Sequence, residues 1–206
     1  MGFSPTRLRN SGVAMKRWRR WLAILAILVV LVVGYVWTHP LVFMGTHRHC
    51  IKFAVLQFLQ YADEHDGRFP SHPKGYGNAL LLMDEACFHA LTGPGYDEAA
   101  LVEAKKSNRE LSEEECGRVY VQGLTRKSNP EIALLFDKLP TPGGDHCHLP
   151  GRLFARLGRE VWLVGGSSTF ILESEWPQFA KTQVELLAAE DFDRAEAERL
   201  FASKPK

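Results

Sequence analysis

The chain has 206 residues, of which 46% are hydrophobic and 11% aromatic, and its formal net charge is +1. This composition excludes a disordered tail, because disordered segments have too little apolar surface to form a core. Residues 1–20 hold six Lys and Arg and no acidic residue, whereas the rest of the chain holds 19 basic and 24 acidic residues. The net charge of −5 beyond residue 20 argues against nucleic acid as a partner.

An uncharged apolar run predicts a transmembrane helix at residues 21–38, which would contact membrane lipid. About 18 helical residues, each rising roughly 1.5 Å, are near the lower limit for crossing a hydrocarbon core of about 30 Å. The positive-inside rule makes residues 1–20 a basic cytoplasmic tail. In a bacterium, this predicts an inner-membrane protein whose residues 46–206 form one periplasmic domain.

A cleaved signal peptide is the main alternative, because it also has a basic region before an apolar core. Residues 34–40, which span the end of the run, contain no small-residue cleavage site of the A-x-A type, and this favours an uncleaved anchor. Met15 is an alternative start of translation.

Periodicity and turn residues predict an α+β domain with helices first and an antiparallel sheet later. The first helix, residues 46–65, is amphipathic and ends at Asp66-Gly67, and its apolar face comprises Ile51, Val55, Phe58, Leu59 and Ala62. Further helices are expected at 78–90 and 97–106, with a capping box at Ser112.

The residue pattern in the second half of the domain predicts strands at residues 118–124, 132–139, 152–157, 161–164 and 169–172. Residues 165–168, Gly-Gly-Ser-Ser, predict a hairpin turn between the last two strands. A C-terminal helix follows, with Trp176, Ala180, Val184 and Leu187 on one face, and Asp191 is expected to cap a last turn.

Residues 61–70 read YADEHDGRFP and follow Cys50. This segment resembles the stretch from Tyr-Ala-Asp to Gly-x-Phe-Pro of pseudopilin-like proteins in the type II secretion and type IV pilus superfamily, especially their planctomycete-type forms. Residues 161–167 are similar in outline to the C-terminal hairpin of that family. The resemblance implies a pilin-like fold, with the amphipathic helix packed on a small antiparallel sheet. It also implies a non-enzymatic role through protein contacts in an envelope or secretion assembly.

Two features of the family pattern are missing from this sequence. Prepilins carry a glutamate at the start of the apolar helix, but the first acidic residue here is Asp63. Gly165 stands where the family hairpin has an aspartate. We therefore expect the anchor to remain uncleaved and the protein not to polymerise as a pilin does.

Two groups of histidine and cysteine offer an alternative function, a metal-binding or redox protein of the envelope. They are His47, His49 and Cys50, and His146, Cys147 and His148. Zinc and copper accept imidazole and thiolate ligands, and two such groups together complete a four-ligand site. The simpler interpretation is a Cys50–Cys147 disulfide flanked by exposed histidines, with Cys87–Cys116 as a second bridge. The sequence also lacks the G-x-S-x-G, phosphate-loop and dinucleotide-binding motifs, so neither an enzyme nor a cofactor is predicted.

We predict that Cys50 and Cys147 form a disulfide in an oxidising compartment. Closing a loop of about 97 residues stabilises the folded state by roughly 4 kcal/mol in the chain-entropy model. Mass spectrometry of unreduced protein from its native membrane measures the bond directly. Four free thiols in that protein would contradict the prediction.

Overall fold

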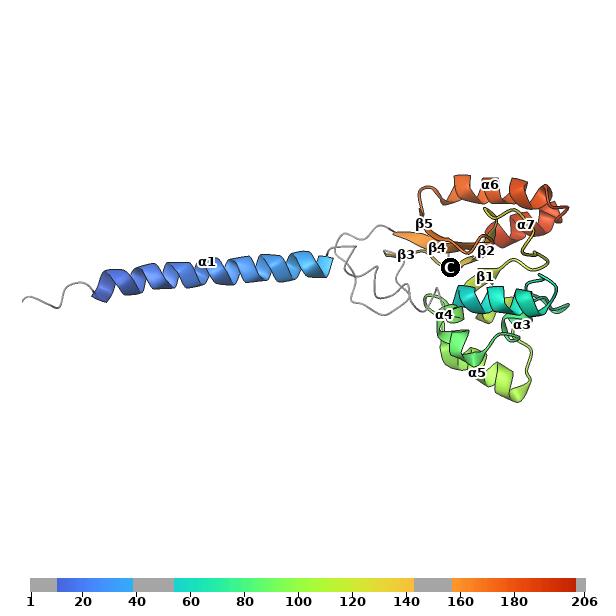
Figure 1. The fold of residues 1–206 in the computed structure, drawn as a ribbon, viewed down its shortest axis with the longest axis horizontal. Helices are drawn as coiled ribbons and strands as arrows, with labels where there is room; N and C mark the ends of the chain where they lie inside the picture. Colours follow the sequence, from blue (N-terminus) through green and yellow to red (C-terminus); the bar gives the residue numbers. More distant parts are fainter. Residues whose placement is uncertain (1–10, 39–53, 143–156, 203–206) are drawn as a thin grey trace, which may run out of the picture. The chain divides into compact units, whose positions relative to one another are not determined.

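The computed structural model describes residues 11–38, 54–142 and 157–202. The chain divides into two compact units, Met1–Phe43 and Met44–Lys206. The first unit contains α1 (Ser11–Thr38), one helix of 28 residues (Figure 1). The helix ends where the apolar run was expected to end but begins well before residue 21, so part of the basic tail is helical.

Within α1, Trp18–Tyr35 is an 18-residue stretch long and apolar enough to cross a membrane, and none of it is buried. This confirms the predicted N-terminal apolar helix. Its length and composition suit both a membrane anchor and a signal sequence, because both have an apolar helical core.

The second unit has three layers: N-terminal helices, an antiparallel sheet and two C-terminal helices (Figure 1). Its first described element is the helix at residues 54–64. Of the predicted apolar face, Val55, Phe58 and Ala62 are buried and Leu59 is half-buried against the core, and Ala54 is buried as well. The helix ends as expected at Asp66 and Gly67, whose φ angles are 56° and 80°. Ile51 lies outside the described residues.

The single helix expected at residues 78–90 is wrong. The structure has α3 (Tyr76–Leu80), the 3-10 helix η1 (Glu85–Cys87) and α4 (Phe88–Thr92) instead. α3 ends at Leu80, and Asp84 begins the new turn: its backbone is extended, and its carboxylate accepts a hydrogen bond from the Ala86 N–H at 2.8 Å. The spacing of apolar residues alone does not reveal such an internal cap.

The polar helix expected at residues 97–106 is confirmed as α5 (Glu98–Ser107), which Asp97 caps. The capping box at Ser112 is also present, although it opens only the short 3-10 helix η2 (Glu113–Glu115). Asn108 ends α5 in the left-handed conformation, with φ of 53°.

The described sheet has five strands, and all their pairings are antiparallel. They are β1 (Arg118–Tyr120), β2 (Ala133–Asp137), β3 (Thr141–Pro142), β4 (Leu157–Leu163) and β5 (Ser168–Leu172). The order is β1-β2-β4-β3, and β5 pairs with β4 through the predicted hairpin turn, where Gly166 has φ of 82°. The strand expected at 152–157 lies outside the described residues except for Leu157, which opens β4.

Two rows of cross-strand neighbours form the two buried faces of the sheet. Tyr120, Leu135 and Trp162 are neighbours in one row, and the Tyr120 ring lies 5.2 Å from Phe58 of the 54–64 helix. Val119, Phe136 and Val161 are neighbours in the other row. Each face of the sheet therefore has its own helical layer.

The third layer consists of α6 (Trp176–Ala188) and α7 (Arg194–Phe201). The Phe136 ring lies 5.3 Å from Trp176 and 4.7 Å from Phe201, so both helices contact β2. Asp193 caps α7, and the expectation that Asp191 does so is wrong. Asp191 has φ of 60° and belongs to the turn between the helices.

We predict that Phe58→Ala destabilises the compact unit by about 3 to 5 kcal/mol, because it leaves a cavity between the 54–64 helix and the sheet. Phe58 is 1% exposed. Leu56→Ala on the same helix is the matched control, since Leu56 is 61% exposed and exposed substitutions change stability by about 0.5 kcal/mol or less. Urea unfolding of the full chain in detergent measures both; equal midpoints would show that this helix does not contribute to the core.

Candidate functional site

The six predicted metal-ligand candidates, His47, His49, Cys50, His146, Cys147 and His148, all lie outside the described residues. The metal-binding hypothesis and the Cys50–Cys147 bond therefore stay predictions. Among the residues that the structure does describe, no group of three or more His, Cys, Asp and Glu is placed to hold a metal ion.

The predicted Cys87–Cys116 bridge is not formed in the structure, where both cysteines are buried free thiols. Burial raises the pKa of the Cys87 thiol to about 11 and that of Cys116 to about 12. The thiols have different surroundings: Asp84 and Lys105 act on Cys87, whereas the Cys116 thiol donates to the Ser112 carbonyl at 3.5 Å. Both remain protonated at neutral pH and are poor nucleophiles.

The strongest electrostatic feature of the compact unit is a buried ion pair between β1 and β2. Arg118 and Asp137 are direct partners in the strand register, and Arg118 Nη1 lies 2.7 Å from Asp137 Oδ1. Their side chains are 0% and 1% exposed. Asp137 Oδ2 also accepts the Glu160 N–H at 2.9 Å, so this carboxylate joins β2 to both neighbouring strands.

Burial raises the pKa of the Asp137 carboxyl, and the adjacent Arg118 opposes that shift. The Arg118 guanidinium lies 4.7 Å from the Trp162 ring, which adds a cation–π contact. Within the described part of the chain, Arg118 Nε and Nη2 and Trp162 Nε1 have no hydrogen-bond acceptor. The pair thus carries a large desolvation cost, which its mutual attraction, the Glu160 N–H bond and the contact with Trp162 offset.

A second buried arginine lies on the opposite face of the sheet. Arg159 of β4 is 4.4 Å from the Trp176 ring at the start of α6. Its Nε and Nη2 each lie 3.0 Å from a carboxylate oxygen of Glu173, and its Nη1 donates to the Lys138 carbonyl at 2.8 Å. This bidentate arrangement fixes the connection from β5 to α6 against β4.

Arg118, Asp137 and Arg159 are each at most 1% exposed, whereas Glu173 is 33% exposed. Their chemistry is structural: they hold β1, β2, β4 and the start of α6 in register. The sequence predicted strands at Arg118 and Asp137 but left Arg159 between two expected strands, and it did not reveal the pairing. An available signal was a charged residue at an inward-facing position in each of two otherwise apolar strands.

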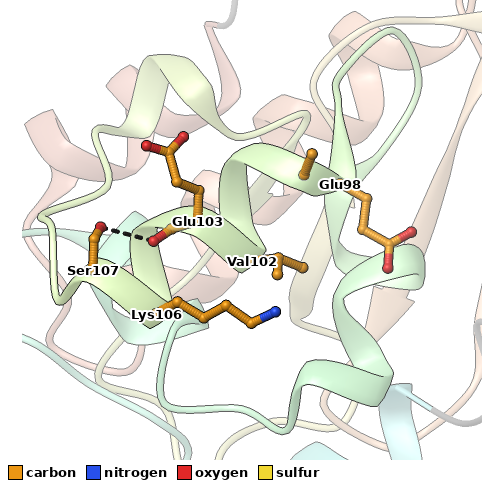
Figure 2. Close-up of a pocket in the computed structure, with 6 residues that line it drawn as sticks. Glu98, Val102, Glu103, Lys106 and Ser107 are labelled. Atoms are coloured by element: carbon orange, nitrogen blue, oxygen red, sulfur yellow. Dashed lines mark hydrogen bonds between the residues drawn. The ribbon is translucent and has the colours of Figure 1, made fainter.

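Among the described residues of the compact unit, accessible hollows lie around α5 and between α6 and α7. A hollow of about 730 Å³ lies on the outer side of α5 and is lined by Glu98, Ala99, Val102, Glu103, Lys106 and Ser107. Figure 2 shows the apolar Val102 side chain between the charged groups of Glu98 and Lys106, while Ser107 donates a hydrogen bond to the Glu103 carbonyl at 2.7 Å. The hollow therefore has an apolar centre and a charged rim.

A second hollow, of about 540 Å³, lies between α3 and α5. It holds several cations, but two of them are neutralised locally: Lys74 pairs with Glu110, and Arg109 pairs with Glu115 at 2.9 Å. The hydrogen bonds from Arg109 and Ser112 lower the pKa of the Glu115 carboxyl to about 2. The hollow therefore does not present concentrated charge to an anionic ligand. The groove between α6 and α7 has a volume of about 350 Å³ and a similar mixture of charges.

In comparisons with protein-family models, curated proteins and solved structures, nothing matches the chain.

We predict that Arg118→Met destabilises the compact unit by about 3 to 5 kcal/mol, because it leaves the Asp137 carboxylate buried without its partner. The double variant Arg118→Met/Asp137→Leu should recover most of that loss, since no buried charge remains. Arg126→Met is the control: Arg126 pairs with Asp63 on the surface, where such pairs contribute about 0 to 1 kcal/mol. Urea unfolding at pH 7 measures all three; a double variant no more stable than the single one would rule out this account.

Proposed function

We propose that this protein is a single-pass membrane protein of pseudopilin-like architecture, whose compact unit acts by contacts with other proteins of an envelope or secretion assembly. The observation that carries the proposal is α1, an exposed apolar helix long enough to cross a bilayer, joined to a separate compact unit. An exposed run of this kind has no stable place in water, because it would leave its whole circumference of apolar side chains hydrated.

The orientation that we propose follows from charge. Residues 1–20 carry six basic residues and no acid, so α1 starts on the cytoplasmic side and the compact unit lies on the other side. In a bacterium with a periplasm this is the oxidising side of the inner membrane. The Cys50–Cys147 bond predicted from the sequence is compatible with that compartment.

The pseudopilin-like part of the proposal is supported by the first two layers of the compact unit. The 54–64 helix packs on an antiparallel sheet through Phe58 and Tyr120, and the sheet ends in the β4–β5 hairpin. The third layer, α6 and α7, covers the opposite face of the sheet through Phe136. Contacts with partners are therefore assigned to the outer surfaces of the helices, such as the hollow on α5, rather than to a bare sheet.

We predict that the protein in native membranes resists carbonate extraction and keeps its N-terminus, starting at Met1, Gly2 or Met15. The double variant Leu25→Arg/Leu28→Arg should be released, because each arginine costs about 2.5 to 3.5 kcal/mol at the centre of a membrane helix. Leu56→Arg is the control, since Leu56 is an exposed residue of the compact unit. An N-terminus within or just after residues 21–40 would instead identify a cleaved signal sequence.

The protein-contact role is tested in the same membranes by chemical cross-linking followed by purification of the tagged chain. We expect discrete adducts with other envelope proteins from the wild type and from the Leu56→Arg control. The Leu25→Arg/Leu28→Arg variant should lose them, because a released chain is no longer held next to its partners. A wild-type chain recovered only as an uncross-linked monomer would contradict this role.

A further inference from the structure

The N-terminal end of α1 presents a group of cations on a continuous helix. Because α1 begins at Ser11, Lys16, Arg17, Arg19 and Arg20 all occupy helical positions. At 3.6 residues per turn, these four positions fall within about 160° of the helix circumference. Residues 16–20 are called the basic segment below.

The length of the apolar run determines how deep the basic segment lies in the bilayer. Residues 21–38 make about 27 Å of helix, slightly less than a hydrocarbon core of about 30 Å. Arg19 and Arg20 therefore lie at the boundary of the core, where long cationic side chains extend to the phosphate level. Trp18 and Trp21 are 66% and 70% exposed and suit the same interfacial level.

The counter-charge for the basic segment does not come from its own unit. The unit Met1–Phe43 contains no Asp or Glu. In the compact unit, by contrast, six arginines each form an ion pair with an acidic residue: Arg109, Arg118, Arg126, Arg159, Arg194 and Arg199. The arginines of α1 thus differ from these six, because no acidic residue of their own unit can pair with them.

We propose that the basic segment binds the headgroups of anionic phospholipids in the leaflet where α1 begins. The inference rests on the proposed membrane anchor and adds the class of lipid that the anchor selects. A guanidinium group binds two phosphate oxygens at once, so Arg19 and Arg20 each match one phosphate. Anionic lipids are preferred over zwitterionic lipids because the phosphate of a zwitterionic lipid already has a cation beside it.

The test uses the full chain in phosphatidylcholine bilayers that contain spin-labelled phosphatidylglycerol or spin-labelled phosphatidylcholine. Electron paramagnetic resonance measures how much of each labelled lipid is immobilised by the protein. We expect the wild type to prefer phosphatidylglycerol. In Arg19→Gln/Arg20→Gln this preference should fall by about fivefold for each arginine removed, the equivalent of about 1 kcal/mol per residue.

Two further variants separate charge from position. Arg19→Lys/Arg20→Lys should keep most of the preference, because both positive charges remain at the same depth. Arg126→Gln/Arg194→Gln removes two exposed arginines of the compact unit and should leave the preference unchanged.

The possible failures are distinguishable. Equal association of both lipids with the wild type would overturn the lipid inference alone, since immobilised lipid still demonstrates an inserted anchor. A preference that survives in Arg19→Gln/Arg20→Gln, or that the control variant loses equally, would overturn it as well. A wild type that immobilises no lipid of either kind would refute the anchor and with it the inference.

Discussion

The ion pair between Arg118 and Asp137 is the interaction on which the order of the compact unit depends. Both side chains are charged and at most 1% exposed, so they must stay paired. A shift of β1 by one residue against β2 would separate the guanidinium from the carboxylate. Asp137 also accepts the Glu160 N–H, so the same carboxylate sets the register of β2 against β4.

The helical layers follow from this fixed sheet. Once the register is set, Tyr120 lies on one face, where Phe58 packs against it, and Phe136 lies on the other, where Trp176 and Phe201 pack. Arg159 likewise connects the third layer to the sheet, because its bonds to Glu173 and Lys138 hold the start of α6 against β4. Covering both faces gives a short sheet enough buried apolar surface to be stable.

The two compact units of the chain correspond to the two roles proposed for it, membrane anchoring and protein contact. The apolar helix α1 is suited to one solvent, the bilayer, and the compact unit to another, water. The Arg118–Asp137 pair of the compact unit is buried, whereas the hollow on α5 has charged residues at its surface. The cationic end of α1 is proposed to add a contact with anionic lipid headgroups.

Much of the fold was predictable, because it depends on local patterns. The apolar run gave α1, the spacing of Val55, Phe58 and Ala62 gave the first helix of the compact unit, and two adjacent glycines gave the β4–β5 hairpin. The break at Asp84 was not predictable from the same patterns. A short polar side chain inside an apolar stretch becomes a cap only when the backbone around it is extended, and tertiary packing decides that.

The sequence by itself determined which segments are apolar, where turns occur and how charge is divided between the two ends of the chain. Only the tertiary structure decided which charged residues meet. Arg118 and Asp137 are distant in the chain, and their pairing depends on strand register, which local periodicity does not specify. The same holds for Cys87 and Cys116: their number suggested a bond, but folding placed each thiol beside different neighbours, and both are free. Long-range pairing is decided by the packing of whole layers, because the energy of a buried contact depends on everything that excludes water from it.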